Sequence, residues 1–129
     1  MKIYKPTLFL DLQKCKQNIQ RMSEKVKKNN LIFRPHFKTH QSIQIGKIFK
    51  EFGINKITVS SVKMAEYFAN AGWKDITIAF PFNPLEINKI EVLSKKIDLN
   101  ILISSLESAE KLIDSTNISL NYFIEIDAG

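Results

Sequence analysis

The chain has 129 residues, a formal net charge of +6, 44% hydrophobic and 25% charged residues. This length suits one ordinary domain with one hydrophobic core. No apolar run approaches the roughly 20 residues that a membrane span requires, and the first residues lack the apolar core of a secretory leader. The single cysteine excludes an internal disulfide. We therefore expect a cytoplasmic protein with no membrane partner.

The positive charge is dispersed along the chain, with lysines from Lys2 to Lys111. Proteins dedicated to nucleic acid more often carry an arginine-rich stripe interleaved with aromatic residues. A spread of lysines is more typical of a solvated surface. We therefore expect no nucleic-acid partner, and a basic nucleic-acid-binding module remains the less favoured alternative.

The first elements are a strand and a helix. Residues 7–11 form a short apolar run after Pro6, which predicts a strand. Apolar residues then recur at intervals of three and four, which predicts an amphipathic helix with Asp11 as N-cap and an end at Asn29-Asn30. The apolar face of this helix comprises Leu12, Cys15, Ile19, Met22 and Val26.

Beyond this helix, apolar runs start near residues 32, 57, 76, 99 and 121, and an amphipathic stretch follows each of the first four. Gly53 suits the end of the second helix, and the third is expected from Ser61 to Gly72. Asn83 with Pro84 predicts the start of the fourth helix. Ser104 and Glu107 have the spacing of a capping box for the fifth.

Alternation of strands and helices predicts parallel βαβ units, and therefore the α/β class. An open doubly wound sheet and part of a (β/α)8 barrel of the TIM type both fit this pattern. A complete barrel needs about 250 residues, whereas this chain supplies about five repeating strands and ends directly after one of them. An apolar parallel strand needs cover on both faces, so we expect an incomplete barrel.

Both histidines of the chain lie in the sequence RPHFKTH, residues 34–40. If residues 32–38 form a strand, their side chains alternate between its two faces. One face then carries Ile32, Arg34, His36 and Lys38, and the other carries Phe33, Pro35 and Phe37. The aromatic face suits packing under helices, and Pro35 indicates an irregular strand because proline lacks a ladder donor.

Lys38 is the candidate for covalent chemistry, because it would stand at the carboxyl end of a barrel strand, where barrel active sites are built. A lysine forms an imine only as the neutral amine, and positive neighbours and partial burial lower its pKa. Arg34, His36 and His40 would supply that positive environment. A solvated basic surface explains the same residues equally well. Metal binding by His36 and His40 is disfavoured, because Pro35 opposes the helix that their spacing would require.

Several stretches resemble one known family. They are Pro6-Thr7-Leu8 with Asp11, Asn18-Ile19 with Met22, the RPHFKTH sequence, the region from Ser60-Ser61 to Ala69-Asn70-Ala71-Gly72, and residues 124–129. Together they resemble the N-terminal region of D-threonine aldolase and D-serine dehydratase-like enzymes. These enzymes belong to the alanine racemase-type barrel class that uses pyridoxal phosphate. The resemblance runs from about residue 6 to the end of the chain.

The resemblance implies that Lys38 forms the internal aldimine with pyridoxal phosphate, and that Arg34, His36, Thr39 and His40 line or brace the pocket. It also implies a lyase for small D-amino acids, in a homodimer of barrels that each carry a C-terminal β-domain. The divalent metal of full-length relatives is bound in that β-domain, so no metal ligand is assigned in this chain.

Residues 1–129 would accordingly be the N-terminal portion of such a barrel, with the rest of the barrel and the β-domain absent. We expect the 129-residue chain alone to be inactive, because much of the phosphate cradle is missing. An amino-acid racemase of the same barrel class and a non-catalytic carrier of pyridoxal phosphate remain alternatives.

Overall fold

The computed structural model describes residues 2–115 and 118–129, in two compact units that divide between Ile32 and Phe33. The first unit contains one helix, α1 (Leu12–Lys28). As expected, Asp11 caps it by accepting a hydrogen bond of 2.9 Å from the Lys14 amide. The helix ends at Asn29, and Asn30 takes a positive φ of 53°. Asparagine tolerates this conformation better than most residues do.

The expected strand at residues 7–11 is wrong, because this stretch has no regular secondary structure. A strand exists only through hydrogen bonds to a neighbouring strand. No strand pairs with residues 7–11 in the part of the chain that the structure describes. Local apolar character was therefore an insufficient signal here.

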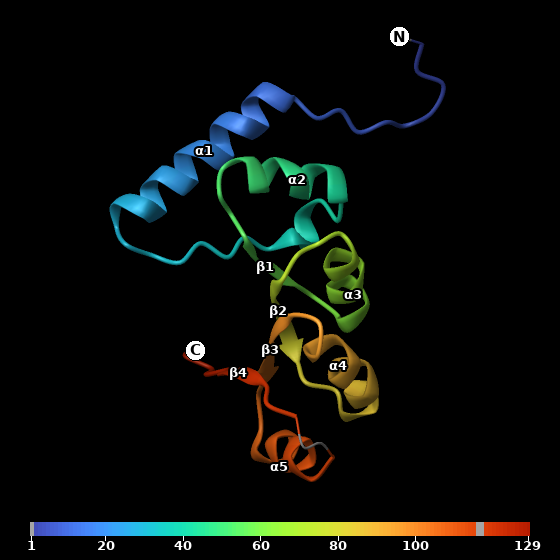
Figure 1. The fold of residues 1–129 in the computed structure, drawn as a ribbon. Coiled ribbons are helices and arrows are strands. Elements are labelled where there is room, and N and C mark those ends of the chain that lie inside the picture. Colours follow the sequence, from blue (N-terminus) through green and yellow to red (C-terminus); the bar gives the residue numbers. More distant parts are fainter. Residues whose placement is uncertain (1, 116–117) are drawn as a thin grey trace. The chain divides into compact units, whose positions relative to one another are not determined.

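The second unit is built on a parallel sheet with the order β1-β2-β3-β4 (Figure 1). The strands are β1 (Lys56–Val59), β2 (Asp75–Pro81), β3 (Asp98–Ile103) and β4 (Asn121–Ile124). They alternate with α3 (Val62–Asn70), α4 (Ile87–Ser94) and α5 (Leu106–Ser115). Each strand pairs with the next strand in the sequence. This confirms the predicted parallel α/β arrangement.

Two glycines end helices as expected. Helix α2 (Ile43–Glu51) is followed by Gly53 at φ 76°, and α3 is followed by Gly72 at φ 84°. Residues other than glycine are strained at such angles. Helix α3 starts next to Ser61, as expected, and Ser61 caps it by accepting a hydrogen bond of 3.1 Å from the Met64 amide.

The remaining two helix starts differ from the prediction. Asn83 caps a short 3₁₀ turn, η2 (Pro84–Glu86), and α4 begins only after that turn. The cap of α5 is Ser105, whose hydroxyl accepts a hydrogen bond of 3.2 Å from the Ser108 amide. The expected capping box from Ser104 to Glu107 is wrong. Glu107 instead pairs with Lys111 one turn further along the helix.

The core lies between the sheet and its helices. Alternate strand residues face it, including Ile57 and Val59 of β1. Phe37, Phe68 and Trp73 supply its large aromatic side chains, and all three are almost fully buried. These aromatic rings also limit how closely the backbone of α2 can approach the core. A Cβ added to Gly46 would stand 3.1 Å from the Phe37 ring, so glycine suits this contact.

The opposite face of the sheet is polar towards its amino end. The strand register aligns Lys56, Asp75 and Asp98 in one row across β1, β2 and β3. The next row on this face consists of Thr58, Thr77, Asn100 and Asn121. Barrel interiors are more commonly filled by Val, Ile and Leu. The inner face of this sheet therefore needs polar partners for its side chains.

Candidate functional site

The segment before Lys38 is only loosely a strand. His36 forms a single parallel bridge with Thr58 of β1, and the Thr58 amide donates a 2.9 Å hydrogen bond to the Pro35 carbonyl. The expected strand over residues 32–38 is therefore wrong in extent, whereas the expected irregularity at Pro35 is confirmed. Proline has no N–H with which to continue the ladder, and the chain turns into a 3₁₀ helix directly after His36.

Lys38 lies in this turn, η1 (Phe37–Thr39), and not on a strand face. Its neighbour Phe37 is fully buried, with ring centroids 5.0 to 5.1 Å from Phe49, Phe68 and Trp73. Lys38 itself is exposed. Because His36 pairs with Thr58, Lys38 stands beyond the carboxyl end of β1. A buried aromatic anchor thus carries an exposed amine at the edge of the sheet where parallel α/β proteins build their sites.

His36 and Thr39 belong to the same turn as Lys38. The Lys38 amide donates a 3.2 Å hydrogen bond to His36 Nδ1, and Thr39 Oγ1 donates one of 3.3 Å to the His36 carbonyl. Burial, and then the charge of Lys38, lower the pKa of His36 below its ordinary 6.5. His36 is therefore neutral near pH 7. Since Nδ1 accepts a hydrogen bond, its proton is on Nε2.

His40 faces the core. Its ring centroid lies 4.4 Å from that of Phe37 and 5.8 Å from that of Phe49. His40 Nδ1 accepts a 3.1 Å hydrogen bond from the Ser42 amide, and its buried Nε2 has no partner among the described residues. Burial lowers the pKa of His40, and the hydrogen bond from Ser42 opposes this effect. His40 therefore supports the η1 turn on the side that faces the core.

Arg34 has a different partner from the one expected. Its Nη1 donates to Asp75 Oδ1 at the start of β2. The positive environment expected around Lys38 is therefore not found in the described structure, because Asp75 neutralises Arg34 and both histidines have lowered pKa values. Of the four expected neighbours of Lys38, the structure places His36 and Thr39 in its turn and turns Arg34 and His40 towards other partners.

Asp75 is the centre of a polar cluster that the sequence did not reveal. It accepts hydrogen bonds from Arg34, Lys56 and Asn100. Burial acts to raise the pKa of Asp75, but the hydrogen bonds and charges of Arg34 and Lys56 together lower it. A charged residue at the start of the apolar strand Asp75–Pro81 was the only sequence signal for this cluster.

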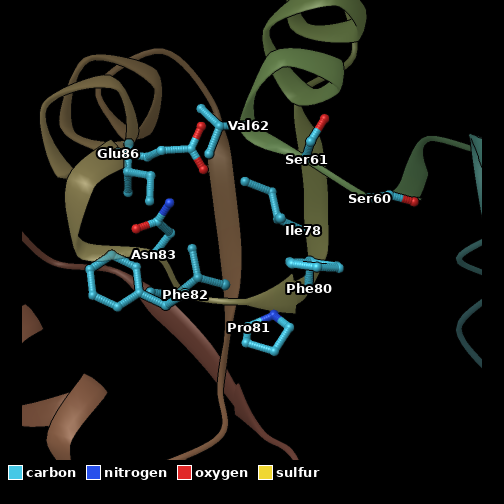
Figure 2. Close-up of a pocket in the computed structure, with 11 residues that line it drawn as sticks. Ser60, Ser61, Val62, Ile78, Phe80, Pro81, Phe82, Asn83 and Glu86 are labelled. Carbon is cyan, nitrogen blue, oxygen red and sulfur yellow. The ribbon is translucent and has the colours of Figure 1, made fainter.

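Two hollows lie near the carboxyl ends of the strands. One, of about 290 Å³, is lined by apolar side chains and by Ser60, Ser61, Asn83 and Glu86. Figure 2 shows these residues approaching it from the segments that follow β1 and β2. A more open hollow of about 500 Å³ is lined by Gln41, Ser61, Lys63, Met64 and Tyr67. Gln41 Nε2 donates a 3.4 Å hydrogen bond to the Lys38 carbonyl, so this second hollow borders the η1 turn.

Gln41 is a further residue that the sequence did not indicate. It adopts a φ of 46°, in the left-handed region, and its amide donates a 2.9 Å hydrogen bond to the Phe37 carbonyl. Non-glycine residues are uncommon in this region and are enriched near functional sites. Gln41 therefore closes the η1 turn at the cost of some backbone strain.

Residues 2–115 and 118–129 contain neither a cluster of metal-binding side chains nor a membrane-spanning helix. No group of three or more histidine, cysteine, aspartate or glutamate side chains is arranged to hold a metal ion there. No helix within those residues is both long enough and apolar enough to cross a membrane.

The chain matches a known protein family over most of its length. Residues 10–129 match the model of the family described as alanine racemase, N-terminal domain. The chain belongs to this family. The match includes the whole η1 turn and every strand of the sheet.

Similar proteins within and around this family are enzymes of D-amino acids. D-threo-3-hydroxyaspartate dehydratase of Delftia sp. is 30% identical over 108 residues, 83% of this chain and 28% of the relative. D-serine dehydratase of Dictyostelium discoideum is 31% identical over 127 residues, 88% of this chain and 32% of the relative. The structure of D-threonine aldolase from Filomicrobium marinum superposes with a TM-score of 0.89 at 22% identity, covering 98% of this chain and 35% of that one. The chain spans about a third of each of these proteins.

Proposed function

We propose that this alanine racemase N-terminal domain is part of a pyridoxal-phosphate-dependent lyase that acts on small D-amino acids. The observation that carries the proposal is the environment of Lys38. The residue before it is anchored in the core, and its own ammonium group is exposed. That group has no ion-pair partner among the described residues. Lys38 stands beyond the carboxyl end of β1, in a turn that borders an open hollow through Gln41.

These residues fit the reactive part of the cofactor. An accessible primary amine is what an aldehyde requires for covalent attachment. The neighbouring groups are a neutral imidazole and a hydroxyl, which can hydrogen-bond to a polar ligand. We therefore assign Lys38 as the covalent attachment point, and His36 and Thr39 as the residues that surround it.

Each residue of the turn has a physical role in this proposal. When bound, pyridoxal phosphate takes up the negative charge that develops on the substrate. The buried ring of Phe37 fixes the turn, so that Lys38 meets the ligand from one direction. His36 Nδ1 is occupied by the Lys38 amide, which leaves its Nε2–H free to donate. Arg34 and His40 brace the segment from two sides through Asp75 and Phe49.

The relatives favour a substrate with a hydroxyl group on C3. D-threo-3-hydroxyaspartate and D-serine, which two of them are named for, share this group and the D configuration. Both names describe dehydratases, so we propose as the reaction the elimination of water across C2 and C3, followed by uptake of water that hydrolyses the resulting imine and releases ammonia. The likeness to D-threonine aldolase extends to the fold alone, and retro-aldol cleavage of a D-3-hydroxy amino acid is the second candidate. A racemase is less well supported, because residues 2–115 and 118–129 identify no second base to act with Lys38.

We extend the proposal to the whole protein in its coarser features. Residues 1–129 would be the N-terminal portion of a (β/α)8 barrel that carries a C-terminal β-domain. The enzyme would be a homodimer in the cytoplasm, and a divalent metal would be bound by residues outside this sequence. Purification of the full-length protein followed by metal analysis and light scattering tests these features together.

The attachment of the cofactor is tested by chemical trapping. The full-length protein is mixed with pyridoxal phosphate, reduced with borohydride, digested and mapped by mass spectrometry. We expect the label on Lys38, and its loss in Lys38→Ala but not in Lys47→Ala, which removes an exposed lysine from α2. Label on a different lysine in the wild-type protein would refute the assignment. Ammonia release from D-serine and from D-threo-3-hydroxyaspartate then tests the reaction.

A further inference from the structure

The segment that carries Lys38 has few backbone contacts with the sheet. Only His36 forms a bridge to β1, whereas β1 and β2 align through four successive residues. The Thr58 amide and hydroxyl bond to the carbonyls of Pro35 and Arg34, the second at a long 3.4 Å. A segment held by so few hydrogen bonds opens more easily than a ladder strand does. An interaction besides these backbone hydrogen bonds is therefore needed to hold the residues before Lys38 in place.

The ion pair between Arg34 and Asp75 supplies an additional attachment. Because His36 pairs with Thr58, Arg34 stands at the level of Lys56, and Lys56 pairs with Asp75. The Arg34 side chain therefore reaches past β1 to the first residue of β2. Both side chains are largely buried, with 19% and 16% of their surfaces exposed. A pair in such surroundings is screened less by solvent than a surface pair.

We propose that Asp75 is a positioning residue for Lys38, acting through Arg34. The carboxylate holds Arg34, and Arg34 fixes the Pro35-His36 segment against β1. The inference rests on the proposed function of Lys38, but it assigns Arg34 and Asp75 to the support of the site and not to contact with the ligand. Asn100 completes the arrangement by donating a 3.3 Å hydrogen bond to Asp75 from β3.

The geometry also provides a matched control. Lys56 forms the other ion pair of Asp75, through the second carboxylate oxygen. Lys56 lies within β1, which is already held by its ladder to β2, so its loss leaves the Lys38 segment attached. Arg34→Met and Lys56→Met each remove one cation from the same carboxylate. They differ in whether the removed cation belongs to the segment that carries Lys38.

The first readout does not depend on cofactor or catalysis. The Thr58 amide is bonded to the Pro35 carbonyl, so its hydrogen exchange reports on opening of the segment. In the full-length protein we expect Arg34→Met and Asp75→Asn to accelerate exchange of the Thr58 amide at least about tenfold. Lys56→Met should change it by less than about twofold. If these ion pairs stabilise only the fold and do not position the Lys38 segment, exchange of the Thr58 amide should accelerate equally in all three variants.

The second readout is the rate of borohydride-trapped labelling at Lys38 by pyridoxal phosphate. We expect it to fall about tenfold in Arg34→Met, since misplacing a reacting group by a fraction of an ångström has effects of this order. Lys56→Met should keep the wild-type rate. Arg34→Lys retains a cation and should recover part of the labelling rate. This variant replaces Arg34→Met in both experiments if Arg34→Met does not fold.

The outcomes separate the two proposals. Selective acceleration at Thr58 together with slower labelling in Arg34→Met supports the positioning role. Equal effects of Arg34→Met and Lys56→Met, or no effect of Arg34→Met on either readout, would overturn it. If wild-type Lys38 is not labelled, the proposed function fails, and any role of Asp75 in positioning a cofactor lysine fails with it. The exchange at Thr58 would then still show whether the ion pair holds the segment.

Discussion

The two ends of the parallel sheet differ in whether their polar side chains are paired or exposed. At the amino end, Arg34, Lys56 and Asn100 converge on Asp75, and every one of these side chains has a partner. At the carboxyl end, Lys38 is exposed and the nearby hollow is lined by Ser61, Lys63 and other residues open to solvent.

In this sheet, the paired side chains lie at the amino end and the exposed candidate site lies at the carboxyl end. In parallel α/β proteins, the carboxyl edge carries the site and the opposite edge carries stabilising contacts. Here the division extends into a single segment, because Arg34 points to the paired end and Lys38, four residues later, belongs to the open end. The segment therefore links the paired end of the sheet to the open end.

The largest expected effect comes from removing the anchor at the open end. Phe37→Ala would leave a cavity among Phe49, Phe68 and Trp73. Loss of a buried phenylalanine costs about 3 to 5 kcal/mol. Chemical denaturation would measure this loss, and Phe80→Ala is the control because Phe80 is 64% exposed. A loss at Phe37 no greater than that at Phe80 would mean that the core does not hold the turn.

The paired end should show the next largest effect. Asp75→Asn leaves two cations without their carboxylate, and we expect a loss of about 2 kcal/mol, reduced from that of a fully buried pair because Lys56 is partly exposed. The folded-state pKa of Asp75 lies below 3.8. Its contribution is therefore complete above the unfolded pKa and is lost as pH falls through the folded one.

Denaturation of the wild type and Asp75→Asn across pH measures this difference. The gap in unfolding free energy should be constant near neutrality and should narrow below about pH 3.8. A gap that persists unchanged into strong acid would show that the carboxylate charge is not responsible.

Local sequence signals were sufficient for one part of this molecule. Apolar periodicity indicated the region of each α-helix, and the cap at Asp11 followed from the residue type alone. Phe37 was correctly expected to pack under the helices. These features depend on neighbours within a few residues, which is the range over which helix periodicity and capping act.

The remaining features depend on partners far away in the sequence. The contact between Arg34 and Asp75 spans 41 residues, and it follows only once the register of His36 against Thr58 and of Lys56 against Asp75 is known. The run at residues 7–11 looked like a strand by composition, but strand formation requires a neighbouring strand. The 3₁₀ turn at Lys38 starts directly after the bridge between His36 and Thr58, and the sequence alone did not show where this bridge would end the strand.

A smaller effect is expected at a helix that starts from the open end. Ser105→Ala removes the hydroxyl that caps α5 and should cost about 1 kcal/mol. Ser104→Ala is a matched control one residue away, because Ser104 makes no corresponding bond to the part of α5 that the structure describes. Thermal denaturation of both variants measures the difference. A larger loss of stability in Ser104→Ala than in Ser105→Ala would indicate that Ser104 caps the helix, as the sequence alone suggested.

The smallest expected effect is a pH dependence from His40, whose ring is only partly buried. Its folded-state pKa is lowered below 6.5, so the unfolded chain binds the proton more readily. Its contribution to stability is therefore complete above pH 6.5 and decreases as pH falls, until the folded imidazole is itself protonated. His40→Phe keeps an aromatic ring against Phe37 and Phe49 and removes the titration. The unfolding free energy of the wild type should fall relative to that of His40→Phe between pH 7 and pH 5, with His36 common to both proteins. A difference that stays constant over this range would show that His40 does not couple protonation to the turn that carries Lys38.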